Sequence, residues 1–405
     1  MPSIGIIRDI TLKAKNHLQT PEVGIFIGAR QAGKTTILRQ LQEELAKDGQ
    51  PNFFLNLEDP EYLALLDASP KNLFQIFSID LTKRTTVFID EVQYLKNPSN
   101  FLKYFYDEYQ GRIKLLVSGS SAFYLDRKFK DSIAGRKKIW QVLTLSFREF
   151  LRFRAAAPLA GRDFGKFTLA ETEQARLHYQ EYLIYGGYPR VVLAQREEKI
   201  ETLKDIAYSY IKKDVLESNI RQEEIFYRLL KILAAQVGNL VNTSELAATL
   251  GVSKTSIDNY LYTMRKSFHL QTIAPFFKNI RKELTKMPKV YFLDLGLRNF
   301  LIDNWQPFFS RADQGALLEN AVFRQLLENY DASEIRFWRT INKNEIDFVV
   351  KEKQAWEVKV NPKQLKMKNY HTFLKTYPEI KFNLASLNVL EPQAADYPII
   401  EAWQI

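Results

Sequence analysis

At 405 residues, the chain is long enough for two or three domains of about 100–200 residues each. It has no cysteine, which excludes disulfides and thiolate zinc sites, and its four histidines lie too far apart in sequence to predict a metal site. The net charge of +10 is compatible with a polyanionic partner and equally with a role in solubility alone. Without a signal-peptide pattern or an apolar run near the roughly 18 residues that span a bilayer, a cytoplasmic protein with no membrane contact is expected.

Residues 20–150 alternate short apolar runs with helical stretches. Runs that are apolar throughout are typical of buried parallel strands with helices on both faces of the sheet. The runs are Glu22–Ile27, Asn52–Leu57, Thr86–Ile89 and Ile113–Val117. Residues 1–150 are therefore predicted to form an α/β domain around a parallel sheet.

A phosphate-binding loop follows the first predicted strand. The segment 28–35 matches G-x4-G-K-[ST] and lies between the strand Val23–Ile27 and the helix Thr36–Lys47. Its glycines let backbone N–H groups wrap a phosphate, and the helix N-terminus favours negative charge. We expect Lys34 to reach the β- and γ-phosphates of ATP and Thr35 to ligate Mg²⁺. The predicted nucleotide-binding residues here are Gly28, Ala29, Arg30, Gln31, Ala32, Gly33, Lys34, Thr35 and Thr36.

Two later strands end in polar residues that suit the same site. The run Val87–Ile89 ends in Asp90, expected to hold Mg²⁺, and Glu91, expected to be the general base for ATP hydrolysis. The next strand ends in Ser118-Gly119-Ser120-Ser121. Ser118 or Ser120 is a candidate sensor of the γ-phosphate, and a plain polar loop is the alternative.

The middle of the chain is predicted to hold a helical lid over residues 151–223 and a winged helix over 224–300. In the second segment, a short helix at Glu245–Leu250, a turn at Gly251 and a longer helix from Ser253 to about Arg265 precede two strands. These strands, at 271–277 and 289–292, flank a basic stretch that suits DNA phosphates, as does Lys254. A winged helix that only packs between domains is the alternative.

Four charged residues stand out in residues 301–405. Glu319 is predicted on a helix, Asp347 on one strand of a hairpin, and Glu357 and Lys359 on the other, where a spacing of two puts them on one face. This order is similar to that of the PD-(D/E)XK nucleases, in which two carboxylates, here Asp347 and Glu357, hold Mg²⁺ or Mn²⁺ and the lysine stabilises the reacting charge. The alternatives are surface charges on an amphipathic hairpin, or a nuclease-like fold without activity.

The chain as a whole resembles a family of prokaryotic AAA-like ATPases related to the STAND group. The segments that carry the resemblance are Gly28–Thr35, Asp90-Glu91, Ser118–Ser121, Gly135-Arg136 and Gly186-Gly187-Tyr188-Pro189. It implies a C-terminal domain with a restriction-endonuclease-like fold, a lid turn at Gly186–Pro189 that senses nucleotide, and an arginine, Arg136, that contacts the γ-phosphate in its own subunit or a neighbouring one. A solvated arginine and a simple tight turn are the alternatives.

These observations give one leading hypothesis and two rivals. The leading one is an ATP-hydrolysing, Mg²⁺-dependent protein directed to DNA, which acts as a homo-oligomer or alone and carries a metal-dependent nuclease-like domain. The first rival is an ATP-driven regulatory switch whose nuclease-like domain is inactive. The second is an ATPase whose later domains only scaffold an oligomer.

Overall fold

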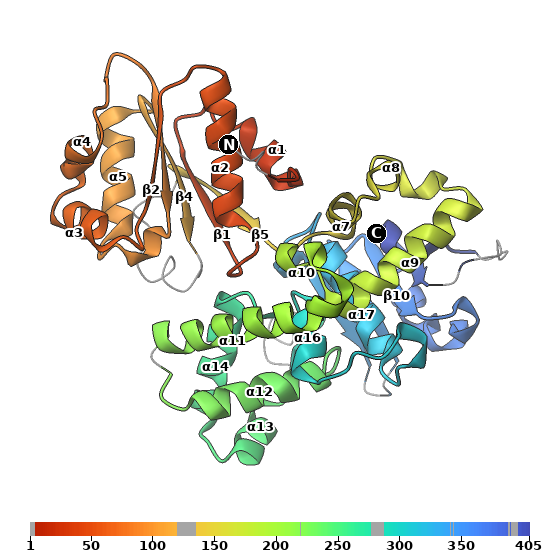
Figure 1. The fold of residues 1–405 in the computed structure, drawn as a ribbon. Helices are drawn as coiled ribbons and strands as arrows, with labels where there is room; N and C mark the ends of the chain where they lie inside the picture. The colour runs from red at the N-terminus through yellow and green to blue at the C-terminus, as the bar shows by residue number, and fades with distance from the viewer. Residues whose placement is uncertain are drawn as a thin grey trace. The chain divides into compact units, whose positions relative to one another are not determined.

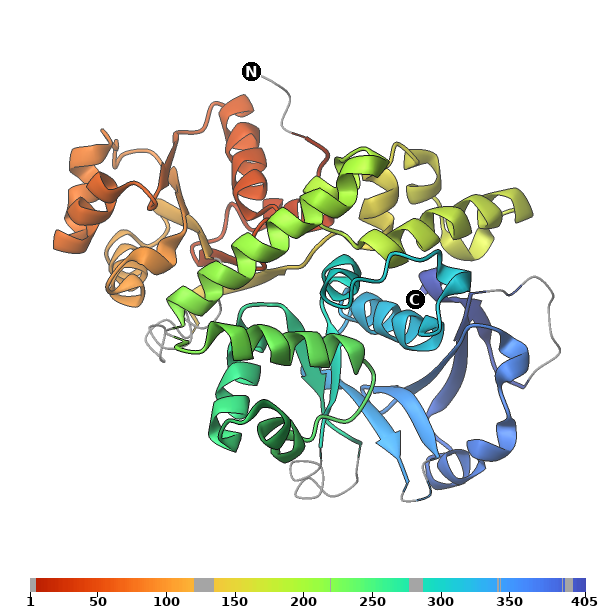
Figure 2. The ribbon, with the colours of Figure 1, turned by 60° about the horizontal axis from the view of Figure 1, so that its bottom comes forward.

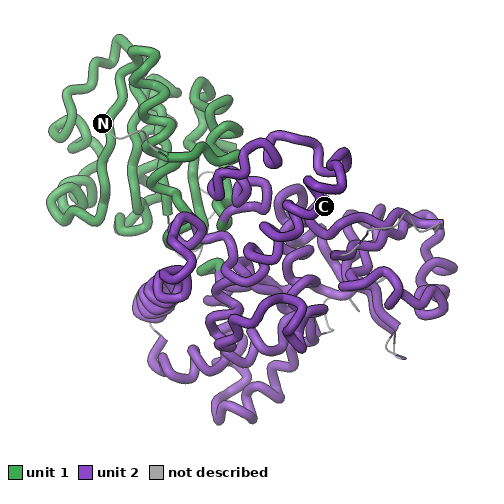
Figure 3. The backbone as a smooth tube through the Cα atoms, turned by 45° about the vertical axis from the view of Figure 1, so that its right-hand side comes forward, with its two compact units in different colours: residues 1–144, 266–268 green, residues 145–265, 269–405 purple. Residues whose placement is uncertain are grey.

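The computed structural model describes residues 5–119, 135–218, 220–276, 287–340, 342, 344–387, 389 and 396–405. The chain divides into two compact units, residues 1–144 with 266–268 and residues 145–265 with 269–405 (Figure 3). Apart from residues 266–268, the predicted lid, winged-helix and nuclease-like domains fall in the second unit, and their separate boundaries stay a prediction. Within the described ranges, no helix is both long and apolar enough to cross a membrane.

The first unit is built on a five-stranded sheet with the order β2-β3-β4-β1-β5, and every neighbouring pair is parallel (Figure 1). This confirms the predicted parallel-sheet α/β fold. Its strands are β1 (Val23–Gly28), β2 (Asn52–Asn56), β3 (Thr85–Asp90), β4 (Ile113–Gly119) and β5 (Lys137–Val142). Its helices are α1 (Asp9–Lys15), α2 (Lys34–Lys47), α3 (Pro60–Ala68), α4 (Leu73–Ile76) and α5 (Pro98–Tyr109).

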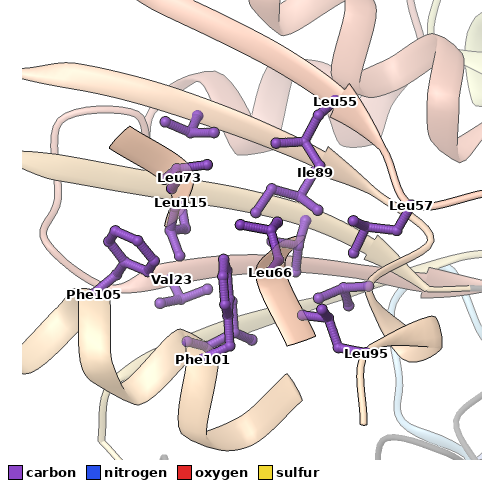
Figure 4. Close-up of a cluster of buried hydrophobic side chains, with 14 of the residues drawn as sticks. Val23, Leu55, Leu57, Leu66, Leu73, Ile89, Leu95, Phe101, Phe105 and Leu115 are labelled. Carbon is purple, nitrogen blue, oxygen red and sulfur yellow. The ribbon is translucent and has the colours of Figure 1, made fainter. Parts of the chain in front are cut away.

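Helices cover both faces of this sheet, as the apolar runs predict. Alternate residues of the strands, among them Val23, Ile89 and Leu115, pack with Phe101 and Phe105 of α5 in the core on one face (Figure 4). The helix α2 lies on the opposite face in Figure 1, and its apolar residues Ile37, Leu38, Leu41 and Leu45 are buried. Burial of both faces holds the strand ends, and the loops that follow them, in fixed positions.

The second unit begins with a helical region. Two of its helices start with a capping box, in which a Ser or Thr hydroxyl and a Glu side chain satisfy each other's backbone N–H groups: Ser146 with Glu149, and Thr168 with Glu171. The helices of this region are α7 (Phe147–Phe153), α8 (Ala157–Ala160), α9 (Leu169–Tyr185), α10 (Pro189–Leu193), α11 (Lys199–Glu217) and α12 (Glu223–Ala235).

A helix pair and a two-stranded hairpin follow. The helix α13 (Thr243–Leu250) is capped by Asn242 and ends at Gly251, and α14 (Lys254–Lys266) follows directly. The antiparallel strands are β6 (Leu270–Ile273) and β7 (Lys289–Phe292). The strand β6 is shorter than the predicted 271–277, because Pro275 has no N–H to donate and instead bridges to Phe337. The basic stretch between the strands, residues 277–286, lies outside the described residues.

The rest of the unit is a mixed sheet with helices beside it. The order is β12-β11-β10-β9-β8, antiparallel between β8, β9 and β10 and parallel from β10 to β12 (Figure 2). The strands are β8 (Ile335–Arg339), β9 (Glu345–Val350), β10 (Gln354–Lys359), β11 (Lys381–Ser386) and β12 (Ile399–Glu401). The helices are α16 (Leu295–Leu301), α17 (Gln314–Leu326), which packs against β10, and α18 (His371–Thr376).

Candidate functional site

The phosphate-binding loop joins the end of β1 to the start of α2. Gly33 has a φ of 98°, in the left-handed region that favours glycine, and it directly precedes the first residue of the helix. The side chain of Lys34 is buried, and its Nζ donates to the carbonyl oxygens of Gly28 at 3.1 Å and Ala29 at 2.9 Å. These bonds hold the ammonium against the loop, so a phosphate bound by the loop would meet it directly.

The predicted Mg²⁺ ligands of this loop contact each other. Thr35 Oγ1 donates to Asp90 Oδ2 at 2.6 Å, which joins α2 to the end of β3. Ser118 at the end of β4 donates to the other Asp90 oxygen, and its own Oγ accepts from the N–H of Glu91 at 3.1 Å. Burial raises the pKa of Asp90, although the hydrogen bonds from Ser118 and Thr35 oppose this shift. A hydroxyl beside a buried carboxylate fits the ligand set of a hard cation.

Glu91 occupies a constrained position after β3. Its backbone is left-handed, with φ of 58° and ψ of 46°, a conformation that is uncommon for a residue with a side chain. One of its carboxylate oxygens accepts from Nε2 of the buried Gln93. The role of Glu91 as the general base stays a prediction.

A buried arginine that no sequence motif marks also holds the loop in place. Arg8 is buried, and its guanidinium donates to the carbonyl oxygens of Ala32 at 2.9 Å and Leu143 at 3.1 Å. It therefore ties the second half of the loop to the chain beyond β5. No motif in the sequence marks Arg8, because its partners are backbone atoms and backbone positions follow only from the fold.

One predicted nucleotide contact, Arg136, does not join this cluster. Arg136 lies next to the start of β1, where its carbonyl accepts from the Val23 N–H, and its Nε donates to Asp107 at 2.8 Å. The loop begins at the other end of β1, about 15–20 Å away for a strand of this length. Arg136 therefore does not reach the loop of its own chain, and only contact with the loop of a second copy stays a prediction. Ser120 lies outside the described residues.

Packing accounts for the predicted lid turn. The N–H of Gly187 donates to Asp294 Oδ2 at 2.9 Å, while Oδ1 of the same carboxylate caps α16 through the N–H of Leu297. A Cβ on Gly186 would lie 2.3 Å from Asp294 Oδ1, and its φ is 72°. The glycines thus let the α9–α10 turn meet the start of α16, and nucleotide sensing by this turn stays a prediction.

The second unit gathers the predicted nuclease-like residues in one place. Glu319 comes from α17, Asp347 from β9, and Glu357 and Lys359 from β10. Asp347 Oδ2 accepts from the N–H of Val358 at 2.8 Å, which places its carboxylate against β10 between Glu357 and Lys359. Lys359 Nζ donates to Glu357 Oε1, and Tyr370 OH donates to the same oxygen at 2.8 Å. The order of residues in the sequence therefore predicts their proximity correctly.

Two further charged residues belong to this cluster and were not predicted. Lys289 of β7 is only 1% exposed, and its Nζ lies 3.0 Å from Glu319 Oε1, 2.5 Å from Glu345 Oε1 and 3.9 Å from Asp347 Oδ1. Glu345 also pairs with Arg339 at 3.1 Å. We name Lys289, Glu319, Glu345, Asp347, Glu357 and Lys359 the carboxylate cluster. Lys289 could not be predicted because it lies on β7, well before the helix and hairpin that carry the motif.

The electrostatics of the carboxylate cluster are those of crowded, buried acids. Burial and the charge of Asp347 raise the pKa of Glu357 to about 8. Burial also raises the pKa of Glu319, to about 7, although Lys289 opposes the shift. Burial lowers the pKa of Lys289, but the surrounding carboxylates outweigh it and the net shift is upward. Acids in this state favour the uptake of positive charge.

A polar cavity of about 540 Å³ opens onto the cluster and is lined by Glu319, Glu345, Asp347, Lys359 and Arg311 among others. Glu357 is 3% exposed, and its Oε2 has no hydrogen-bond partner. Among the described residues, no group of three or more His, Asp or Glu is arranged to hold a metal ion. What the cluster offers a cation is the predicted pair, Asp347 and Glu357, with Lys359 beside it.

A second polar cavity, of about 470 Å³, lies between α13, α14 and the hairpin. Its lining includes Thr243, Ser244, Lys254, Arg265 and Thr272. Lys254 and Arg265 are exposed, at the two ends of α14, and Ser253 Oγ accepts from the N–H of Ser256 where the helix begins. Hydroxyl groups, cations and a helix N-terminus together suit a phosphate backbone.

Family comparison agrees with the geometry of the first unit. Residues 20–151 match the model of an AAA domain, which contains the loop, Asp90, Glu91 and Ser118. This part of the chain is therefore an AAA-type P-loop ATPase domain. Residues 176–307 match one domain of unknown function (DUF8612) and residues 314–405 match another (DUF4143).

Relatives span most of the chain. An uncharacterized protein of Methanocaldococcus jannaschii is 25% identical over 404 residues, which cover 95% of this chain and 84% of that protein. One of Haemophilus influenzae is 25% identical over 357 residues, or 84% of each chain. Among solved structures, the RuvB branch migration motor of Thermotoga maritima gives a TM-score of 0.33 at 17% identity, covering 68% of this chain and 91% of that one. Likeness at this level adds nothing to the functional assignment.

Proposed function

We propose that this chain binds and hydrolyses ATP with Mg²⁺, engages DNA, and carries a metal-dependent nuclease-like site in its C-terminal sheet. The observation that carries the proposal is the contact of Thr35 with Asp90, beside Lys34 and Glu91, in an AAA-type domain. Thr35 and Asp90 would hold Mg²⁺, the loop and Lys34 would bind the phosphates, and Glu91 would accept the proton of the attacking water.

DNA engagement is supported by the second polar cavity. The order α13, Gly251, α14, β6 and β7 is that of a winged helix, in which the second helix meets DNA. Lys254 and Arg265 lie at the two ends of α14 and line this cavity, and the chain carries a net charge of +10. Contacts of this kind are to phosphates, which would make binding strong at low salt and largely independent of sequence.

Nuclease-like chemistry is supported by the carboxylate cluster. Asp347 and Glu357 would hold Mg²⁺ or Mn²⁺ in water-rich coordination, since hard divalent ions of this kind keep several waters. The bound ion would lower the pKa of a coordinated water and neutralise a phosphate. Lys359, next to Glu357, would stabilise the charge that builds up on the phosphate.

One observation favours the rival in which this site is inactive. The ammonium of Lys289 already pairs with Glu319 and Glu345, so fewer of their oxygens are left to bind a metal ion. A regulatory ATPase that binds DNA without cutting it would tolerate such an arrangement. Cleavage assays decide between the two functions.

A paired assay of ATP hydrolysis and supercoiled-plasmid cleavage, with Mg²⁺ or Mn²⁺, tests the proposal. Asp347→Ala and Lys359→Ala are expected to abolish cutting and leave ATP hydrolysis intact, because the two sites lie in different units. Lys34→Ala is expected to abolish hydrolysis. Lys363→Ala, an exposed lysine beyond β10, is the matched control and should preserve both activities.

The outcomes separate the hypotheses. If DNA stimulates ATP hydrolysis but no metal supports cleavage, the result favours the regulatory-switch hypothesis. If DNA does not affect ATP hydrolysis and does not bind at low salt, the result favours the scaffold hypothesis. Cleavage that survives Asp347→Ala would come from a contaminant, and unchanged hydrolysis in Lys34→Ala would refute the assignment of the nucleotide site.

A further inference from the structure

The carboxylate cluster has an unusual balance of charges. Four carboxylates, Glu319, Glu345, Asp347 and Glu357, meet two lysines, and one of these lysines, Lys289, is buried among three of the four. A buried ammonium is costly unless carboxylates surround it, and here Glu319 and Glu345 lie 3.0 and 2.5 Å from its Nζ. Lys289 is therefore a fixed positive charge within the site.

The hydrogen bonds decide which oxygens are left for a metal ion. Glu319 Oε1 accepts from Lys289 and from Tyr291 OH, and Glu345 is shared between Lys289 and Arg339. Each of these two acids therefore has at least one oxygen bound to a protein cation. In contrast, Glu357 Oε2 is buried without a hydrogen-bond partner, and the nearest cation to Asp347 Oδ1 is Lys289 at the longer distance of 3.9 Å.

We infer that Lys289 takes the place of a second metal ion, so that the cluster accepts one divalent cation, held by Asp347 and Glu357. The inference rests on the proposed nuclease-like site and specifies its metal content. Loss of the Lys289 charge would free Glu319 and Glu345 as oxygen ligands and make the cavity more negative. Carboxylate number and charge set the affinity of such sites for hard divalent ions.

Mn²⁺ binding to the full-length, nucleotide-free protein tests this inference, with electron paramagnetic resonance to count bound and free ions. The wild type is expected to bind one Mn²⁺ that Asp347→Ala loses. Lys289→Met is expected to bind the first ion at least tenfold more tightly and to take up a second, seen as spin coupling between two Mn²⁺ ions. Lys363→Met is the control for loss of a lysine and should match the wild type.

A second variant keeps the test decisive if Lys289→Met does not fold. Glu345→Gln removes an acid that the inference assigns to Lys289 and Arg339, so it should still bind one Mn²⁺ within about threefold of the wild-type affinity. Loss of Mn²⁺ in Glu345→Gln would overturn the inference, as would a folded Lys289→Met that binds a single ion with wild-type affinity, or a wild type that binds two ions that Asp347→Ala loses.

The same titration distinguishes failure of the inference from failure of the proposed site. If wild type and Lys289→Met both bind no Mn²⁺, both the nuclease-like metal site and the role of Lys289 are refuted. If Lys289→Met alone binds Mn²⁺, Lys289 closes the whole metal site in the native protein, which refutes the proposed metal site and overturns the inference of one bound cation. If the wild type binds one Mn²⁺ that Asp347→Ala loses and Lys289→Met gains nothing, the proposed site stands and only the inference fails.

Discussion

Individual side chains, rather than the loop alone, define the nucleotide site. Thr35 follows the loop, Asp90 ends β3 and Ser118 ends β4, yet the three form one chain of hydrogen bonds. Parallel strands bring their carboxyl ends to one edge of the sheet, so residues distant in sequence meet there. Glu91 directly follows the end of β3. Its N–H donates to Ser118 Oγ, and this hydrogen bond stabilises its left-handed backbone conformation.

The Glu91→Gln substitution tests the general base. The amide cannot accept a proton, so we expect ATP binding close to wild type and hydrolysis reduced about 10²–10⁴-fold, the usual value of a positioned base. Equilibrium binding of a fluorescent ATP analogue and steady-state phosphate release measure the two effects. Glu108→Gln, at an exposed site on α5, should leave both unchanged. Wild-type turnover in Glu91→Gln would show that another group is the base.

Asp313 is a second residue whose charge matters. It bonds to Arg311 at 2.8 and 2.9 Å and to Arg298, and both arginines are buried. Asp313→Asn would leave these cations poorly compensated, so we expect the free energy of unfolding to fall by about 2–3 kcal/mol, below the 3–5 kcal/mol of a fully buried pair. Urea denaturation at pH 7 measures this. Asp205→Asn, whose ion pair is exposed, should change stability by less than about 0.5 kcal/mol.

The pH dependence of the same group has a definite sign. Burial alone would raise the pKa of Asp313, but hydrogen bonds from Arg311 and Arg298 outweigh burial and lower this pKa to about 2. The folded-state pKa lies below the unfolded value of about 3.9, so the stabilisation is complete above pH 4 and is lost as the pH falls toward 2. The stability difference between wild type and Asp313→Asn should therefore shrink between pH 4 and 2. A constant difference over this range would refute the assignment.

At the scale of whole elements, α14 and the strands after it form the candidate DNA surface. Lys254→Ala and Arg265→Ala should each weaken binding to a labelled duplex about equally across sequences and lower the slope of log K against log salt by about one. Fluorescence anisotropy at several salt concentrations measures both. Lys231→Ala on α12 removes an exposed charge outside the cavity and is the control. An equal effect of Lys231→Ala would point to general charge attraction.

Strands that form a continuous apolar run in the sequence could be predicted, and strands without such a run could not. The four continuous apolar runs correspond to β1 to β4. Of these, β1, β3 and β4 are buried almost throughout, whereas the edge strand β2 is mostly half-buried. The strand β5 was missed because it has no continuous apolar run: Lys137, Lys138 and Gln141 interrupt it and remain outside the core. The strands β11 and β12 were missed as well: they lie near the end of the chain, and no motif drew attention to them.

The candidate sites show the same limit. Asp90 and the loop were predictable because their spacing and strand-loop-helix context follow from the phosphate chemistry. Arg8, Gln93 and Lys289 were not, because each is defined by a partner that only the fold brings near. Arg136 illustrates the converse: a family position predicted a phosphate contact, and the topology puts that residue at the opposite end of β1.

For the whole molecule, the division into two units predicts separate responses to nucleotide. Mg²⁺ with a non-hydrolysable ATP analogue should stabilise the first unit alone, by about 2.7 kcal/mol at 100 times the dissociation constant. Calorimetry should then show two transitions, of which one moves to higher temperature. Asp347→Ala should behave as wild type and Lys34→Ala should show no shift. A single transition that moves as a whole would mean that the two units unfold cooperatively.

The position of Lys289 also constrains how such a gene can be rearranged. This lysine belongs to the hairpin that follows α14, whereas its partners Glu319, Glu345 and Asp347 belong to the segment that matches a separate domain model, residues 314–405. A recombination event that exchanged the last segment alone would pair an unmatched buried ammonium with foreign side chains. We therefore expect the two segments to be exchanged between proteins only when position 289 and its acidic partners change together. The carboxylate cluster thus restricts recombination between these segments.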